Sequence, residues 1–374
     1  MNKVTSKSEM ITCRKAFAFS IALLFLSLGI IKAQNNSTSP ADSLNKALAN
    51  AKNDSTRIIL LIELSKEYQF EDFATAKLRA EEATSLAEQL NLSWAKEKAY
   101  KQQSYLASIR GDFLTALKFD KARLPLAMAS QDSVLIANAY NYLGNEYVSL
   151  GEYDEAYYYF TQSFRISRAI NDSLQTAIAI HNVGTVFKEM GQYDIALDHI
   201  KLAQTISERV GDLDGLAYTY LEIGDIYLRS NKYKEAEEAL MKSLEVTRQR
   251  DIDILEPEIV SRIARLYFRK GDYDIANSYY DTVEFLHSKT QNEYGLAESI
   301  LGKGRVNLRQ KNFNDALNLI LEALNIAKRI NARTLEIECY RALSTLYEER
   351  ADYKSALTYT KQAKVLQDSL FSQD

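Results

Sequence analysis

The sequence predicts an all-α solenoid of antiparallel helix pairs, and this prediction rests on three columns of residues that recur every forty positions. Shifting the chain by forty aligns an aromatic column, an alanine column three residues later, and an aliphatic column ten residues after the alanines. The aromatic column consists of Phe73, Phe113, Tyr153, Tyr193, Tyr233, Tyr273, Phe313 and Tyr353. A fixed period of roughly twenty to fifty residues is typical of repeat arrays, in which each unit completes its core against its neighbours. We therefore expect function to lie along an extended surface.

The composition fits one elongated helical domain. Only 3 prolines and 13 glycines occur in 374 residues, and both residue types are costly inside helices. The chain is 46% apolar and 26% charged, as expected for a globular helical protein. A chain of this length would ordinarily suggest about two or three domains, but the strict internal period outweighs that expectation.

The first 33 residues have the layout of a secretory signal peptide. A polar, basic stretch precedes sixteen almost uninterrupted apolar residues at 16–31, and Ala33 is followed by a polar run. Because a membrane-spanning helix needs about twenty apolar residues, we favour cleavage near Ala33 over a retained anchor. The mature protein is then expected to be periplasmic or otherwise extracytoplasmic. It would contact a membrane only through this segment, if the segment stays uncleaved.

The remaining chain divides into a capping region, a repeat region and a short tail. Residues 34–56 are expected to form a polar lead-in and an N-terminal capping helix, because a terminal repeat has only one neighbour and needs a polar outer face. Residues 57–370 divide into eight helix pairs, and residues 371–374 form the tail. The first helix of each pair, called the A helix, starts near residue 57, 97, 137, 177, 217, 257, 297 or 337. The second is called the B helix.

Residues at the helix boundaries support this division. Asn53, Asp132 and Asp172 stand at the start of expected A helices, where their side chains can accept hydrogen bonds from free backbone amides. Pro257 can occupy a first-turn position, where its missing N–H costs nothing. Gly151 separates the two helices of the third pair, where a left-handed conformation favours glycine.

Charge and motifs argue against several classes of function. The formal net charge is −4, and it becomes −8 without the signal peptide, so we expect no basic surface for nucleic acid. The sequence has no glycine-rich phosphate loop and no Cys/His cluster with metal-ligand spacing. His181, His199 and His287 fall in different phases of the repeat and cannot converge on one site. We therefore expect no enzymatic activity and no catalytic, cofactor-binding or metal-binding residues.

Within each unit the residue types resemble the tetratricopeptide repeat. The clearest unit carries the motif residues Tyr140, Leu143, Gly144, Tyr147, Tyr153, Ala156 and Phe160. The resemblance covers residues 57–370 and implies a right-handed superhelix whose concave face is lined by the A helices. The period of forty exceeds the common one of about thirty-four and is similar to that of the bacterial sensory and regulatory branch of the family.

Two units depart from this motif and are expected to be the loosest. In the unit that starts at 97, Gln103 and Ser104 stand where the clearest unit has leucine and glycine. In the unit that starts at 297, Lys303 and Asn307 stand where it has leucine and tyrosine.

The resemblance places candidate ligand-binding residues at exposed positions of the A helices. Side-chain amides can bond both the N–H and the C=O of an extended peptide, and arginine can bind a carboxylate with two hydrogen bonds. We predict an asparagine ladder toward the N-terminal half and an arginine strip toward the C-terminal half. The candidates are Asn138, Asn141, Asn145, His181, Thr185, Lys188, Asp225, Arg265, Arg305 and Arg341. The alternative is that these residues are the polar surface that any soluble helix presents.

The predicted function is that of an exported scaffold that binds a protein or peptide partner through its concave face. The alternative is a ligand-sensing input module of a two-component signalling system. The signal peptide and the long repeats also look like the extracytoplasmic sensor region of tetratricopeptide-repeat histidine kinases. Self-association through the C-terminal helix is a further hypothesis, because Val365, Leu370 and Phe371 are apolar at the end of the array.

Overall fold

The computed structural model describes residues 39–70, 72–252, 254–290 and 292–371, and helices dominate this part of the chain. Seventeen helices and no strands occur among these residues, which confirms the all-α class. The chain divides into two units, residues 1–50 and residues 51–374.

In the first unit the structure describes helix α2 (Pro40–Asn50), none of whose residues is buried. The expected signal peptide at 1–33 lies outside the described residues. Among the helices that are described, none has both the length and the apolar character needed to cross a membrane.

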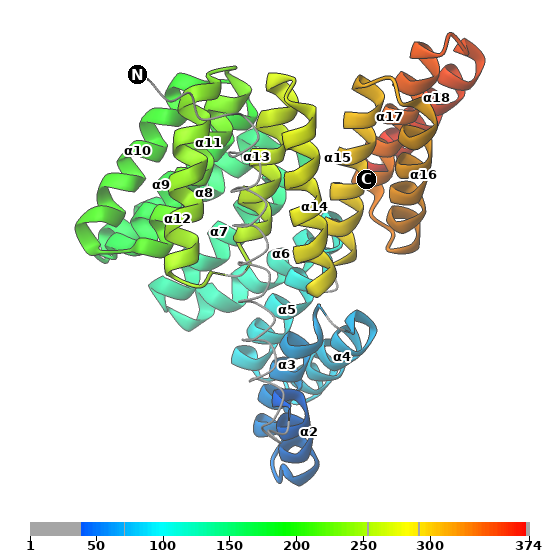
Figure 1. The fold of residues 1–374 in the computed structure, drawn as a ribbon. Coiled ribbons are helices and arrows are strands. Elements are labelled where there is room, and N and C mark those ends of the chain that lie inside the picture. The colour runs from blue at the N-terminus through cyan, green and yellow to red at the C-terminus, as the bar shows by residue number, and fades with distance from the viewer. Residues whose placement is uncertain (1–38, 71, 253, 291, 372–374) are drawn as a thin grey trace, which may run out of the picture. The chain divides into compact units, whose positions relative to one another are not determined.

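The second unit is an array of eight helical hairpins, each formed by an A helix and the B helix that follows it (Figure 1). Every helix packs mainly on the helix before it and the helix after it, so neighbours in the chain are neighbours in space. The hairpins are α3 (Asp54–Tyr68) with α4 (Phe73–Gln89), α5 (Ser93–Ser108) with α6 (Phe113–Ser130), α7 (Ser133–Leu150) with α8 (Tyr153–Ala169), α9 (Ser173–Glu189) with α10 (Tyr193–Val210), α11 (Leu213–Arg229) with α12 (Tyr233–Gln249), α13 (Glu256–Lys270) with α14 (Tyr273–Lys289), α15 (Glu293–Arg309) with α16 (Phe313–Arg329), and α17 (Arg333–Glu349) with α18 (Tyr353–Phe371).

Local sequence sets the helix ends. The side chain of Asn53 accepts a hydrogen bond from the backbone N–H of Thr56 and so begins α3. Gly151 ends α7 with a φ of 80°, in the left-handed region that glycine adopts at little cost. Pro257 lies in the first turn of α13, where no hydrogen bond needs its missing N–H.

The alanine and glycine columns let the two helices of a hairpin approach closely. All eight residues of the alanine column are buried. A β-carbon added to Gly184 would lie 2.7 Å from the side chain of Ile200, and one added to Gly224 would lie 2.6 Å from Leu240. Real β-carbons essentially never approach other heavy atoms that closely. The small residues are therefore required by the packing of each hairpin.

The A helices lie on the inner side of the stacked hairpins. Consecutive A helices contact one another along most of the array, whereas consecutive B helices in the described residues approach less closely. The side on which neighbouring helices converge is the concave side. Side chains that the A helices present on this side form what we call the inner wall.

Candidate functional site

All ten residues predicted to bind a ligand lie on A helices, but their surroundings differ. Those on α7 are Asn138, Asn141 and Asn145, those on α9 are His181, Thr185 and Lys188, and those on α11, α13, α15 and α17 are Asp225, Arg265, Arg305 and Arg341. His181 and Thr185 are half-buried, and the Thr185 hydroxyl donates to the backbone carbonyl of His181 within α9.

Of the three predicted asparagines on α7, one is hydrogen-bonded to the next A helix and the other two face a pocket or solvent. Asn141 accepts a hydrogen bond of 2.8 Å from the side-chain amide of Asn182 on the next A helix. Asn138 is half-buried and lines a pocket, and Asn145 is exposed. The bond between Asn141 and Asn182 uses one donor and one acceptor, which leaves the other amide group of each side chain for a ligand. Sequence reasoning missed Asn182, the partner on the neighbouring helix.

A pocket of about 500 Å³ opens between α3, α5 and α7. Among its lining residues are Glu97 and Arg123, which form an almost fully buried ion pair. The half-buried rings of Tyr105 and Tyr142 line the pocket as well. Lys101 lies over the Tyr142 ring at 5.1 Å, and the Arg123 guanidinium lies over it at 4.7 Å. The pocket thus combines aromatic surface with hydrogen-bonding and charged groups, a mixture that suits part of a peptide.

Lys188 and Asp225 belong to a buried ion cluster instead of an open surface. The Lys188 ammonium lies 2.7 Å from Glu222 and 3.4 Å from Asp225. Asp225 also lies 2.9 Å from Arg229 and 3.6 Å from Arg262. The side chains of Lys188 and Asp225 are 4% and 0% exposed, so the prediction that both positions are exposed is wrong. Successive A helices lie so close together that charged side chains on one helix reach those on the next.

The ion cluster fixes the charges of its members. Burial alone would raise the pKa of Asp225, but Arg262, Lys188 and Arg229 outweigh it and hold that pKa far below its usual range. Burial also opposes the charge of Lys188, yet Glu222 and Asp225 raise its pKa above the ordinary value. These groups are therefore charged near neutral pH, and their attraction ties α9, α11 and α13 together.

The arginines of the predicted strip differ in their partners. Arg305 pairs with Glu338 at 3.0 Å, and Arg341 donates to Gln367 at 2.9 Å. Arg265 is half-buried and makes no ion pair or hydrogen bond within the described part of the chain, and burial lowers its pKa. Arg265 is thus the member of the strip whose donors remain for an anionic group of a ligand.

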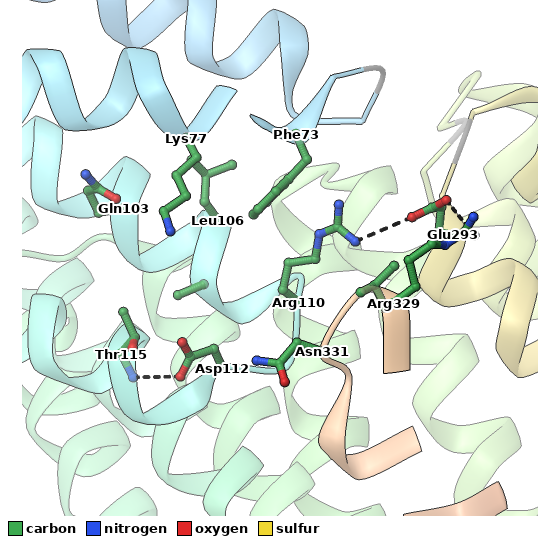
Figure 2. A pocket seen from close by; sticks show the side chains of 12 residues that line it. Phe73, Lys77, Gln103, Leu106, Arg110, Asp112, Thr115, Glu293, Arg329 and Asn331 are labelled. Carbon is green, nitrogen blue, oxygen red and sulfur yellow. Dashed lines mark hydrogen bonds and ion pairs between the residues drawn. The ribbon is translucent and has the colours of Figure 1, made fainter. Parts of the chain in front are cut away.

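A second pocket, of about 390 Å³, lies where the turn of the second hairpin meets the seventh hairpin (Figure 2). Figure 2 shows Arg110 between the ring of Phe73 and the carboxylate of Glu293. The Arg110 guanidinium lies over the Phe73 ring at 4.1 Å, and its Nη1 lies 3.9 Å from Glu293. Arg329 holds the same carboxylate at 2.8 Å. We call the contacts of Arg110, Glu293 and Arg329 the seam.

The described residues contain no group of three or more histidine, cysteine or carboxylate side chains that could hold a metal ion. His181, His199 and His287 lie on three different helices, α9, α10 and α14.

The stacked hairpins and their inner wall define a solenoid of the helical-repeat class. The family model described as the tetratricopeptide repeat matches residues 135–209, 175–249 and 295–364. The repeats in these ranges are tetratricopeptide repeats, as the residue columns predicted. Among curated proteins, none matches the sequence significantly.

Several solved structures are similar in fold at low sequence identity. A Rap protein complexed with the competence and sporulation factor has a TM-score of 0.65 and 13% identity, over 89% of this chain and 98% of that chain. The Rap conjugation gene regulator of plasmid pLS20, in complex with a Phr peptide, has a TM-score of 0.64 and 13% identity, over 88% and 94%. The apo quorum sensor NprR from B. thuringiensis has a TM-score of 0.57 and 14% identity, over 96% and 99%. At such low identity these TM-scores show a shared fold alone, and the resemblance to a kinase sensor region stays a prediction.

Proposed function

We propose that this protein is a scaffold that binds a peptide, or an extended segment of a protein, on its inner wall. The observation that carries the proposal is the run of partly open polar groups from the pocket between α3, α5 and α7 to the Asn141–Asn182 pair. An extended backbone presents N–H and C=O groups at regular intervals, and side-chain amides can bond to both. Two of the similar structures are complexes with a factor or a peptide, which supports a ligand of this class.

Each part of the wall has its own task in this proposal. The pocket would hold one side chain of the ligand against Tyr105 and Tyr142. Asn138 and Asn141 would bond to the ligand backbone, and Arg265 would bind an acidic side chain or a terminal carboxylate farther along the wall. Lys188 and Asp225 would act indirectly, by fixing the spacing of the A helices between these two regions.

The proposal includes a location outside the cytoplasm, because residues 1–33 have the layout of a signal peptide. Mass spectrometry of the protein from its native host would then find an N-terminus near Gln34. A ligand-sensing input module of a two-component system would use the same wall. Co-purification of a histidine kinase with the native protein would favour that role.

Affinity measurements on two matched variants test the binding surface. Peptides are selected from a random library on the purified protein, and the dissociation constant of the best one is measured by fluorescence anisotropy. The double variant Asn138→Ala with Asn141→Ala should bind roughly 5- to 150-fold more weakly, since two lost hydrogen bonds at roughly 0.5–1.5 kcal/mol each amount to about 1–3 kcal/mol. Asn325→Ala makes the same change at an exposed position of the outer helix α16 and should leave affinity unchanged.

Helical circular dichroism of both variants shows whether the array remains folded. Equal affinity of the wild type and the folded double variant would remove the inner wall of α7 from the binding site. Equal losses in the double variant and in Asn325→Ala would show that the selected peptide binds elsewhere.

A further inference from the structure

Four buried charged residues interrupt the repeat columns within the second hairpin and at its junction with the third. Glu146 stands in a column whose other buried members are Leu106, Val186, Ile226, Leu266, Val306 and Leu346. Asp120 stands where the third to seventh hairpins have phenylalanine, isoleucine, leucine or tyrosine, and Arg123 stands where other hairpins have alanine, serine or valine. Glu97 stands in a position that is mostly alanine. Four buried charges thus replace apolar or small residues within one junction.

Three of these residues form an ion network inside the second hairpin. Arg123 donates two hydrogen bonds to Oε1 of Glu97, at 2.9 and 3.2 Å, and one to Asp120. Ser104 donates to the second oxygen of Asp120 at 2.6 Å. One guanidinium therefore balances two buried carboxylates, and no positive charge of this network remains for a third.

Glu146 is that third carboxyl group, and it has no cation of its own. Ser108 of α5 donates to its Oε1, whereas its Oε2 has no hydrogen-bond partner although the residue is only 6% exposed. Asp120 of α6, whose own ion-pair partner is Arg123, acts on the pKa of Glu146, and among the described residues no charged group of α8 or α9 does so. An ionised carboxylate here would be both desolvated and unpaired.

The same junction is the least tightly closed one between A helices. In the described residues, every pair of consecutive A helices is in close contact except α5 and α7. The pocket of about 500 Å³ opens between these helices, and Tyr142 in its wall precedes Glu146 by one helical turn. A shift of α7 against α5 would therefore change the width of the pocket.

We propose that Glu146 makes the junction of α5 and α7 a proton-operated joint. With its proton bound, the neutral carboxyl group fits the buried position and α7 packs on α5. When the O–H bond breaks and the proton passes to solvent, the carboxylate draws water into the junction and the joint opens. The joint needs no ligand, so it can be tested separately from the peptide-binding proposal.

The direction of the pH dependence follows from the surroundings of Glu146. Burial raises the pKa of Glu146 from 4.5 to about 7; the bond from Ser108 opposes this rise, and Asp120 adds to it. The closed joint binds the proton more tightly than the open one, so closure is complete at low pH. Closure is lost as the pH rises from about 4.5 through about 7. The shift corresponds to a change on the order of a hundredfold in the opening equilibrium.

Amide hydrogen exchange of the full-length protein tests the joint. Protection of α5 and α7 is measured from pH 5.5 to 8.5 and corrected for the intrinsic pH dependence of exchange. In the wild type, protection should fall by roughly thirtyfold across this range, because about one unit of the titration lies below pH 5.5. In Glu146→Gln, which keeps the shape without the charge, and in Glu146→Leu, which restores the residue type of the column, protection should stay high at every pH.

Glu97→Gln is the matched control, because it neutralises a buried carboxylate of the same junction that has a cation partner. It should lower protection at every pH while the wild-type pH profile remains. Parallel profiles in the wild type and in Glu146→Gln would overturn the proposal. Poor protection of both Glu146 variants at every pH would also overturn it, since the ionised carboxylate would then be what holds the two helices together.

Discussion

Gly144 of α7 lies against the ring of Phe160 on α8 so closely that a β-carbon on the glycine would be 2.4 Å from the ring. Phe160 is almost fully buried and cannot move away, because Ala156, Val183 and Val186 pack in the same cluster. The close contact therefore fixes how near the two helices of the third hairpin lie.

Gly144→Ala should consequently destabilise the third hairpin. Overpacking a tight helix contact costs typically about 1–3 kcal/mol, less the small gain that alanine brings to a helix interior. The urea midpoint of the helical signal reports this loss. Ser149→Ala changes an exposed residue of the same helix and should leave the midpoint nearly unchanged. An unchanged midpoint in Gly144→Ala would show that the hairpin can spread without cost.

Lys188→Met should destabilise the array more strongly than a surface substitution. It leaves Glu222 and Asp225 without their shared cation inside the ion cluster. Removing one partner of a buried ion pair typically costs about 3–5 kcal/mol. The arginines around Asp225 still pair with its carboxylate, so the loss of stability measured by thermal melting should lie toward the lower end of this range. Adding Glu222→Leu to the variant should restore part of the stability, and no recovery would contradict the pairing.

The repeat architecture could be predicted from the sequence because the columns have a direct geometric cause. Two helices can approach closely only where a small residue such as glycine or alanine lies between them, and the contact of Gly144 with Phe160 is an example. The unit containing Gln103 and Ser104 was expected to be loose, and the structure places a buried ion network there. Whether this unit opens more readily stays a prediction, which hydrogen exchange can measure.

Contacts between repeats could not be predicted from the repeat alone. The frame of forty aligns Asn141 with His181, but the hydrogen bond goes to Asn182, one position later. The side chains that meet across neighbouring A helices thus do not share a position in the frame of forty, and the sequence does not state how the two helices are set against each other. For the same reason Lys188 and Asp225 were expected on the surface although each reaches the neighbouring helix.

The acid sensitivity of the sixth hairpin should depend on His287. Its ring lies against Gly295, its Nδ1 has no hydrogen-bond partner, and burial lowers its pKa to about 4. The folded state therefore resists protonation, so stability that is present above about pH 6.5 is lost as the pH falls toward 4. The loss should amount to roughly 1–3 kcal/mol.

Thermal melts of His287→Leu between pH 7.5 and 4.5 check this expectation. The variant should lose less stability on acidification than the wild type does, whereas His199→Leu should keep the wild-type loss. The direction is opposite to that of the Glu146 joint, which tightens on acidification, so the two effects can be told apart. Identical acid profiles in the wild type and in His287→Leu would rule out this histidine as the cause.

The seam between the second and seventh hairpins should loosen when the charge of Glu293 is removed or when the salt concentration is raised. Glu293→Gln removes the charge that Arg110 and Arg329 share. Partly exposed ion pairs are worth at most about 1 kcal/mol, so the expected effect is a looser seam with little change in melting temperature. Spin labels at exposed Lys118 on α6 and Glu322 on α16 should show a broader distance distribution in this variant.

High salt should broaden the wild-type distribution in the same way, because about 1 M salt shortens the screening length to roughly 3 Å. Asp214→Asn removes an exposed ion pair with Arg250, away from the seam, and should leave the distribution unchanged. These results would show that ion pairs outside the aromatic, alanine and aliphatic columns hold the second and seventh hairpins together. The distance distribution could instead be the same in Glu293→Gln, in high salt and in the wild type. In that case the packing of the hairpins alone fixes the distance between the second and seventh hairpins, and the ion pairs of the seam do not contribute to it.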